Sequence, residues 1–373
     1  MGWRRTILVF LCIGGVVLST PLTAEAARGT PDSPEFGYGA RLDLDGSYLE
    51  QAVNSAAELR LDWISVDLNW AKRWPDPNSQ PDLRNLDEVF AAAAQFNLVV
   101  LLSLSAAPDW AMGEHGPDPR LTAWFVVNLE RRYGNKLAAV ELFPAANTAV
   151  GWGGPPDARA YTELLTTVQA SIKEAGIPVL VVAGGLTPLL PGKSNGDIDD
   201  LAFLQGLYDA GAREVMPVVS LHLADVSGDS LQPPVAGGPP SLRHYEEIRK
   251  VMVANNHSDG VIWITDLSWP SGRIGVEDAT INTPQAQSLW LSQAYRQLRA
   301  QLYIGTVFIH RLNPPAEGQA SPDESSTSLI RANLNRHPFY NILGQLATQN
   351  LREASEAPAF DHPQEKNLFK VRP

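Results

Sequence analysis

Cysteine is almost absent from this chain, and that absence removes several kinds of site. Only one of the 373 residues is a cysteine, Cys12, and it lies in an apolar N-terminal segment. The remainder therefore has no disulfide, no thiol nucleophile and no thiolate metal ligand. The seven histidines are scattered without metal-binding spacing, and no nucleophile elbow or glycine-rich phosphate loop is present. The sequence predicts no metal and no cofactor.

Positive charge is also scarce. The chain has 29 Lys and Arg residues against 41 Asp and Glu, a net charge of −12. Binding to phosphate-rich partners needs a concentrated positive field. The composition therefore argues against nucleic acid, or an anionic membrane surface, as the main partner. At 44% hydrophobic and 19% charged residues, the balance is that of an ordinary globular protein with a sizeable core.

The N-terminus carries the only long apolar run. Arg4 and Arg5 precede an almost wholly apolar stretch over 6–18, and the small residues Ala24 and Ala26 follow on either side of Glu25. This is the pattern of a secretory signal peptide, assigned here to residues 1–26. An uncleaved anchor is the alternative, although the run is short for a transmembrane helix. We therefore expect a secreted or extracytoplasmic protein, tethered only if the signal is retained.

Downstream of the signal, short apolar strands alternate with amphipathic helices. The eight predicted strands begin near Phe36, Trp63, Leu98, Ala138, Pro178, Pro217, Val261 and Ile304. The helices are predicted at 48–59, 86–95, 122–133, 158–174, 200–210, 242–254, 283–301 and about 338–351. This order predicts an α/β fold, a single (β/α)₈ TIM barrel over 27–352, with a flexible tail at 353–373. A doubly wound open sheet is the alternative.

The Pro- and Gly-rich stretches lie on one side of this pattern. The segments 184–196, 227–241 and 314–328 all follow a strand, whereas connections that follow a helix are short. In a barrel, loops that follow strands build the C-terminal rim, where active sites are located. We therefore expect the functional face there.

Two of the predicted strands run into loops with a distinctive composition. The first reads Val-Glu-Leu-Phe-Pro-Ala-Ala-Asn over 140–147, followed by Gly-Trp-Gly-Gly over 151–154. The second reads Ile-Trp-Ile-Thr-Asp-Leu-Ser-Trp over 262–269. Together with the strand order, these phrases resemble the clan A glycoside hydrolases, retaining barrels with two catalytic glutamates that include many xylosidases and cellulases. The resemblance covers most of the mature chain.

The resemblance implies a damaged catalytic pair. Where the family has Asn-Glu-Pro, this chain has Pro144, Ala145 and Ala146, so the acid/base glutamate is replaced by Ala145. Asp266 occupies the nucleophile position, one methylene short of glutamate, and His222 falls where such enzymes often have His or Tyr. Retaining hydrolysis needs both carboxyls, and loss of general acid catalysis costs about 10²–10⁴ in rate.

Other acidic residues are predicted at strand ends and are candidates for a relocated acid. They are Asp67, Asp109 and Asp225. Carboxylates at such junctions also serve as helix caps or as acceptors for sugar hydroxyls, and these roles remain open.

Aromatic residues favour a carbohydrate groove. Flat indoles at a concave rim stack on the apolar faces of sugar rings. The candidates at or just past strand ends are Trp70, Trp74, Trp110, Trp152 and Trp269. Polar contacts are predicted from Asp67, Asp109, Asn147, His222 and His310. The remaining tryptophans considered are assigned to packing: Trp63, Trp124, Trp263 and Trp290.

The leading hypothesis is an exported glycoside hydrolase-like barrel that is catalytically inactive and binds poly- or oligosaccharide in a tryptophan-rich groove. One alternative is an active glycosidase that uses Asp266 with a relocated acid such as Asp67 or Asp109. Another is an extracellular scaffold that binds a protein through its rim loops. A fold of this kind hosts many functions and cannot choose among them. The sequence does not define the sugar, the linkage or the oligomeric state.

Overall fold

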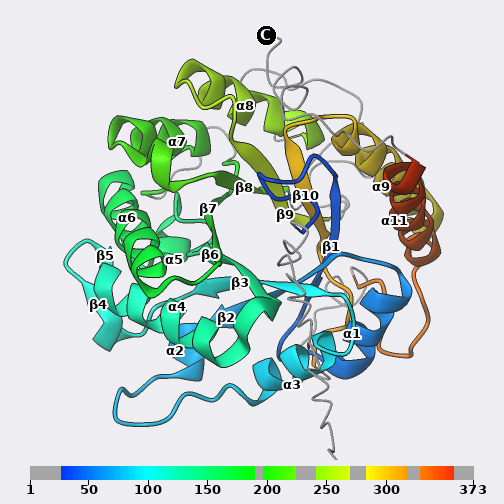
Figure 1. Ribbon diagram of the computed structural model, residues 1–373, viewed down its shortest axis with the longest axis horizontal. Coiled ribbons are helices and arrows are strands. Elements are labelled where there is room, and N and C mark those ends of the chain that lie inside the picture. The colour runs from blue at the N-terminus through cyan, green and yellow to red at the C-terminus, as the bar shows by residue number, and fades with distance from the viewer. Residues whose placement is uncertain (1–26, 190–195, 224–240, 269–282, 317–327, 357–373) are drawn as a thin grey trace, which may run out of the picture.

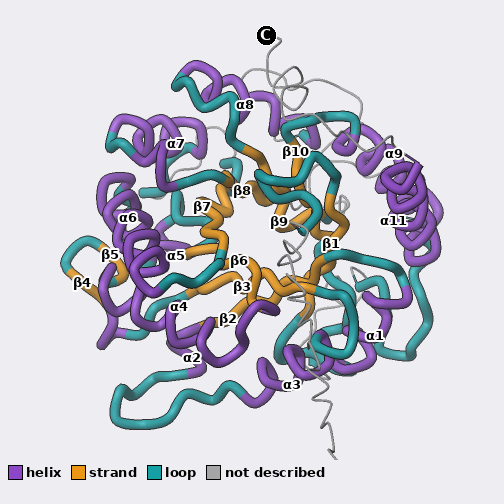
Figure 2. The backbone as a smooth tube through the Cα atoms, viewed as in Figure 1, coloured by secondary structure: helices purple, strands orange, loops and turns teal. Residues whose placement is uncertain are grey.

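A closed barrel of eight parallel strands forms the centre of the molecule. The computed structural model describes residues 27–189, 196–223, 241–268, 283–316 and 328–356, of which 350–356 are described as backbone only. The strands follow one another around the barrel in the order β1-β10-β9-β8-β7-β6-β3-β2. Their bounds are β1 Gly37–Leu42, β2 Trp63–Asn69, β3 Val99–Ser105, β6 Leu137–Leu142, β7 Leu180–Leu186, β8 Val218–Leu223, β9 Val261–Leu267 and β10 Ile304–Ile309. Figure 2 shows this ring of strands surrounded by helices.

Closure confirms the predicted (β/α)₈ barrel. β1 pairs in parallel with β10 on one side and with β2 on the other, so the sheet has no free edge. The doubly wound alternative is thereby excluded. Each strand begins within two residues of its predicted start. The prediction is this accurate because parallel strands buried on both faces are read directly from continuous apolar runs such as 99–102.

The helices cover the outside of the barrel (Figure 1). Several begin at side-chain caps, as when Asp157 accepts hydrogen bonds from the backbone N–H groups of Arg159 and Ala160. α11 continues to Glu356, past the expected start of the tail at 353. The principal helices are α1 Leu49–Glu58, α3 Arg84–Ala93, α4 Pro119–Tyr133, α6 Ala158–Ala175, α7 Asp200–Asp209, α8 Tyr245–Ala254, α9 Pro284–Arg299 and α11 Phe339–Glu356.

Sequence periodicity did not predict several short elements. Two are single-turn helices on the rim, α2 Trp70–Arg73 and α5 Ala149–Trp152. A small antiparallel pair, β4 Met112–Gly113 and β5 Gly116–Pro117, lies between β3 and α4. Four 3₁₀ turns complete the described elements: Asp109–Ala111, Gly134–Lys136, Ala212–Val215 and Leu242–His244.

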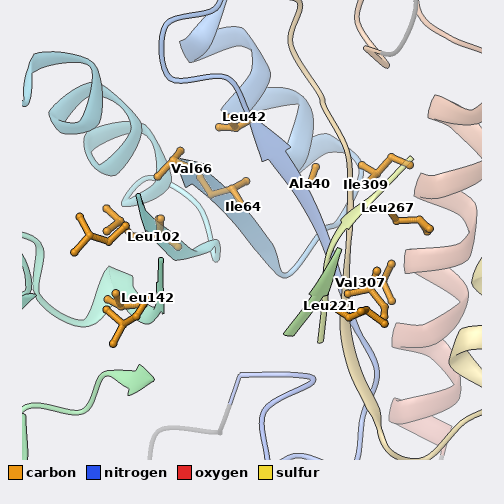
Figure 3. Packing of buried hydrophobic residues seen from close by; sticks show 14 of the residues in the cluster. Ala40, Leu42, Ile64, Val66, Leu102, Leu142, Leu221, Leu267, Val307 and Ile309 are labelled. Carbon is orange, nitrogen blue, oxygen red and sulfur yellow. The ribbon is translucent and has the colours of Figure 1, made fainter. Parts of the chain in front are cut away.

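The main core lies between the strands and the helices. Residues such as Ile64, Val66, Leu102 and Leu142 face this layer, and Figure 3 shows them together with core residues of β8, β9 and β10 from another part of the barrel. Because side chains alternate along a strand, the intervening residues point into the barrel.

The interior of the barrel is closed at its N-terminal end by a second, smaller core. It contains Trp63, Trp263 and Phe308 with small aliphatic residues from the other strands. The indole N–H groups of Trp63 and Trp263 donate to the carbonyl oxygens of Arg28 and Gly29 at 2.8 and 2.6 Å. The segment that precedes β1 therefore seals the floor, and the two indoles have the packing role that the sequence assigned to them.

Three expectations fall partly or wholly outside the described residues. They are the signal at 1–26, parts of the three long rim loops and the part of the tail beyond residue 356. Within the described residues, no helix is long and apolar enough to cross a membrane.

Candidate functional site

A cluster of charged and polar side chains lies above the aromatic floor. Alternate residues of each strand point into the barrel. From the floor toward the C-terminal ends of the strands, these inward residues are first hydroxyl side chains and then charged ones. The charged and imidazole groups are Arg41 of β1, Asp67 of β2, Glu141 of β6, His222 of β8, Asp266 of β9 and His310, which follows β10. We call this set the mouth cluster.

Asp266 is the most constrained carboxylate of the mouth cluster. One oxygen is paired with Nη1 of Arg41, and the other lies 2.8 Å from Nδ1 of His310. Burial by itself would raise the pKa of Asp266, but the charges of His310 and Arg41 outweigh it and hold the pKa below its ordinary value. Asp266 is therefore ionised and fixed in position at neutral pH.

Asp67 shares the same guanidinium group but behaves differently. Its carboxylate lies 3.9 Å from Nη2 of Arg41 and accepts a 2.6 Å hydrogen bond from the hydroxyl of Ser105. Its position deep in the mouth raises its pKa, and Arg41 and Ser105 offset this only in part. One arginine thus stands between two carboxyl groups whose pKa values move in opposite directions.

Glu141 lies beneath these groups and is almost completely buried, at 1% exposure. It accepts hydrogen bonds from Ser103 of β3 at 2.5 Å and from Thr265 of β9 at 2.7 Å. Nε2 of His222 is 4.0 Å away. The carboxylate therefore links three strands below the mouth. The sequence analysis did not select Glu141, although a single acidic residue within an otherwise apolar strand indicates a buried polar contact.

The loop after β6 carries no carboxylate at the position of the expected acid. Ala145 adopts a left-handed conformation with φ of 61°, and its N–H donates to the carbonyl of Gly185 at 2.9 Å. Its own carbonyl accepts from the N–H and the hydroxyl of Thr148. The loop is thus held by backbone contacts to the next strand and to the turn before α5.

A pocket of about 270 Å³ lies beside the mouth cluster. Its lining includes Arg41, Asp67 and His310, together with Lys72 and Arg73 from α2. Asp45, which also lines the pocket, is paired with Lys72 at 2.6 Å and with Arg73. Alternating donors and acceptors of this kind suit a polar, hydroxyl-rich ligand. Among the described residues, no group of three or more His, Cys, Asp or Glu side chains could hold a metal ion.

Comparison with solved structures identifies the fold. A family 39 glycoside hydrolase from the gut symbiont Bacteroides cellulosilyticus WH2 superposes with a TM-score of 0.62 at 18% identity, covering 84% of this chain and 64% of that one. A family 30 endoxylanase from Clostridium papyrosolvens C71 gives 0.55 at 13% identity, with 84% and 72% covered. An exo-β-1,4-mannosidase from Opitutaceae bacterium strain TAV5 gives 0.57 at 11% identity, with 86% and 60% covered.

The chain has the barrel fold of the clan A glycoside hydrolases. The resemblance read from the sequence is confirmed at the level of the fold. The chain spans only 64% of the family 39 enzyme and 60% of the mannosidase. No protein-family model matches the sequence, and no curated protein does.

Within this barrel, the structure brings together four of the residues expected at the site. Asp67, His222, Asp266 and His310 all belong to the mouth cluster. Asp109 does not, because it is exposed at the start of a 3₁₀ turn after β3. Trp269 lies outside the described residues, as does Asp225.

The expected tryptophan groove needs correction. Trp70 is completely buried and stacks on Phe125 with ring centroids 4.7 Å apart. Trp152 is 1% exposed, and its indole N–H donates to the carbonyl of His115 at 2.8 Å. The sequence placed both at strand ends, but the chain folds back over them. Neither ring offers a face to a sugar in this structure.

Asn147 needs the same correction. It is completely buried, and its amide group donates to the carbonyls of Thr187 and Ile198 at 2.9 and 3.0 Å. Its side-chain oxygen accepts from the N–H of Thr187. Asn147 therefore joins two rim loops and has no atom left to face the mouth. Trp110 is half-buried, and its indole N–H donates to the carbonyl of Trp74; Trp110 is not part of the mouth cluster.

Proposed function

We propose that this protein is an exported carbohydrate-binding barrel that does not cleave glycosidic bonds by the retaining two-glutamate mechanism. The single observation that carries the proposal is Ala145 at the position of the general acid. Backbone hydrogen bonds fix the conformation of the loop that contains it. A methyl group cannot protonate a leaving oxygen. The solved structures with this fold bear the names of enzymes that act on carbohydrates, which supports a sugar as the ligand.

The mouth cluster and its pocket supply what a sugar needs. Arg41 and Lys72 offer N–H donors, whereas Asp67 offers acceptors. Because the pocket also contains Asp43 and Asp45, its positive and negative charges nearly balance. We therefore expect a neutral saccharide in preference to a strongly anionic one.

Binding is tested by isothermal titration with neutral gluco-, xylo- and manno-oligosaccharides. We expect Asp67→Asn to weaken binding about tenfold, equivalent to about 1.4 kcal/mol, because a charged acceptor is lost. Asp32→Asn is the matched control, since Asp32 is exposed and belongs to neither the mouth cluster nor the pocket lining. Equal affinity in all three proteins would refute binding at the mouth.

A second candidate function rests on one specific observation. Asp67 and Asp266 face the same guanidinium group, with the pKa of Asp67 raised and that of Asp266 lowered. Two carboxyl groups with divergent pKa values are the arrangement by which glycosidases separate acid from base. Inverting glycosidases hold their acid and base carboxyl groups about 6.5–9.5 Å apart. In this candidate, Asp67 protonates the leaving oxygen and Asp266 activates water.

Activated aryl glycosides distinguish the two candidates, because a good leaving group does not need a general acid. The binding proposal predicts the same background release from the wild type, Asp266→Asn and Asp67→Asn. Release that disappears in Asp266→Asn would instead establish a competent carboxylate. Further loss in Asp67→Asn, confined to substrates with poor leaving groups, would assign Asp67 as the acid.

A further inference from the structure

An exposed tryptophan marks a surface that the mouth cluster does not include. Trp124 of α4 is 49% exposed, which is unusual for so large an apolar ring. The sequence assigned it to packing, as a helical residue. Its exposed indole instead lies beside Trp74, the residue that follows α2, with ring centroids 5.8 Å apart and planes tilted by 39°. Figure 1 shows α2 and α4 side by side at the periphery of the barrel.

Trp124 belongs to a group of aromatic rings that runs from the core to the surface. Trp70 and Phe125 form its buried base. Trp74 and Trp110 are half-buried above them, 5.0 Å apart and inclined at 69°. We call the outer three residues, Trp74, Trp110 and Trp124, the aromatic platform.

Hydrogen bonds fix the two inner rings of the platform. The indole N–H of Trp74 donates to the carbonyl of Ser79 at 3.0 Å, and that of Trp110 donates to the carbonyl of Trp74 at 3.1 Å. Rings that are already held lose little conformational freedom when a ligand stacks on them. The platform is therefore preorganised for binding.

The surroundings of the platform are polar. Residues 75–80, which follow Trp74, are all exposed and include Asp76, Asn78, Ser79 and Gln80, and Asp109 beside Trp110 is exposed as well. Protein interfaces bury aromatic anchors within a wider apolar core. Aromatic rings bordered by hydroxyl, amide and carboxylate groups instead match a sugar, whose apolar ring face has polar edges.

The platform continues the pocket along the chain. Lys72 and Arg73 of α2 line the pocket, and Trp74 is the next residue. α2 therefore connects the pocket lining directly to the first ring of the platform in the chain. We propose that the aromatic platform is a second saccharide subsite, so that the ligand is an oligo- or polysaccharide whose further rings stack on Trp74 and Trp124. This inference rests on the proposed carbohydrate binding at the mouth.

The test uses neutral β-linked gluco-, xylo- and manno-oligosaccharides from monosaccharide to hexasaccharide, titrated into the full chain. We expect affinity to rise with chain length in the wild type. In Trp124→Ala, binding of the longest ligands should fall about tenfold, while that of the shortest is unchanged. Leu302→Ala is the matched control, because Leu302 is 82% exposed and belongs to neither site.

Unchanged binding of long ligands by Trp124→Ala would overturn the platform, as would affinity that does not depend on length. The single variant Asp67→Asn, measured in parallel, distinguishes the platform subsite from the proposed binding at the mouth. If Asp67→Asn weakens binding of short and long ligands and Trp124→Ala has no effect, binding at the mouth is supported and the platform subsite is refuted. If only Trp124→Ala weakens binding, the platform is supported and binding at the mouth is refuted. Self-association that Trp124→Ala abolishes, with no saccharide bound, would identify a protein interface and refute the subsite.

Discussion

Nδ1 of His310 lies 2.8 Å from one oxygen of Asp266, while Arg41 pairs with the other oxygen. His310 follows β10 and Arg41 belongs to β1, the two strands whose pairing closes the barrel. Both oxygens of a buried carboxylate are thus occupied by cationic or polarised N–H groups. Asp266 is held as a structural ion at the same time as it faces the candidate site.

Arg41→Met should destabilise the protein at neutral pH. It leaves the buried charge of Asp266 without its arginine partner, and removing one partner of a buried pair costs about 3–5 kcal/mol. Urea unfolding at pH 7 measures the loss. Because burial then raises the pKa of Asp266, the deficit relative to the wild type should shrink as the pH falls.

The double variant Arg41→Met with Asp266→Asn provides the control for this first prediction. It removes the uncompensated charge, so it should recover most of the lost stability. An Arg41→Met protein as stable as the wild type at pH 7 would show that the pair does not support the fold.

Replacing Glu141 should also destabilise the barrel. Glu141→Leu leaves the hydroxyls of Ser103 and Thr265 without their acceptor, at a cost of about 2–6 kcal/mol for two buried polar groups. Glu141→Gln keeps one oxygen and should cost about 1–2 kcal/mol. Glu50→Gln is the exposed control and should change the unfolding free energy by less than about 0.5 kcal/mol. Equal unfolding midpoints in urea for all four proteins would contradict this role.

Asp62 should make the folding stability fall as the pH rises, whereas most carboxylates make it rise. Burial raises its pKa to about 6, although Arg28 and the N–H of Tyr38 oppose the shift. An unfolded aspartate titrates near pH 3.9, so between these values the native state holds more protons and stability falls as the pH rises. The full effect is on the order of 3 kcal/mol.

Asp62→Asn removes this contribution and still offers an oxygen to the N–H of Tyr38. We therefore expect the stability of the variant relative to the wild type to increase between pH 4 and 6.5, as measured by urea unfolding at several pH values. A constant difference between the two proteins over that range would refute the raised pKa.

Trp152→Ala should lower the stability of the protein. Any effect on saccharide binding should follow only from that loss of stability. The indole is buried, donates to the carbonyl of His115 and packs against Gly116 in β5. Its loss should cost about 3–5 kcal/mol and increase hydrogen exchange in the β4–β5 pair. Trp124→Ala should leave the unfolding free energy within about 0.5 kcal/mol. If Trp152→Ala were as stable as the wild type but bound saccharide poorly, the groove first expected from the sequence would be restored.

The barrel was predictable because its signals are local. Runs such as 99–102 and 179–182 are apolar on both faces, and buried parallel strands require this pattern. The single-turn helices α2 and α5 were not predictable, since four residues are too few to show a period. The site was predictable in part. Asp67 and Asp266 were selected at strand ends, whereas Arg41 was not selected.

The sequence by itself determined the order of the elements, the end of the strands at which the mouth cluster lies and the absence of an acid at Ala145, because each depends on residue type and position in the chain. Only the tertiary structure decided which tryptophans are exposed and which carboxylates share a partner. Burial of Trp70 and Trp152 depends on loops that fold back over them. The contact of Arg41 with Asp266 joins residues 225 positions apart and exists only because the sheet closes on itself.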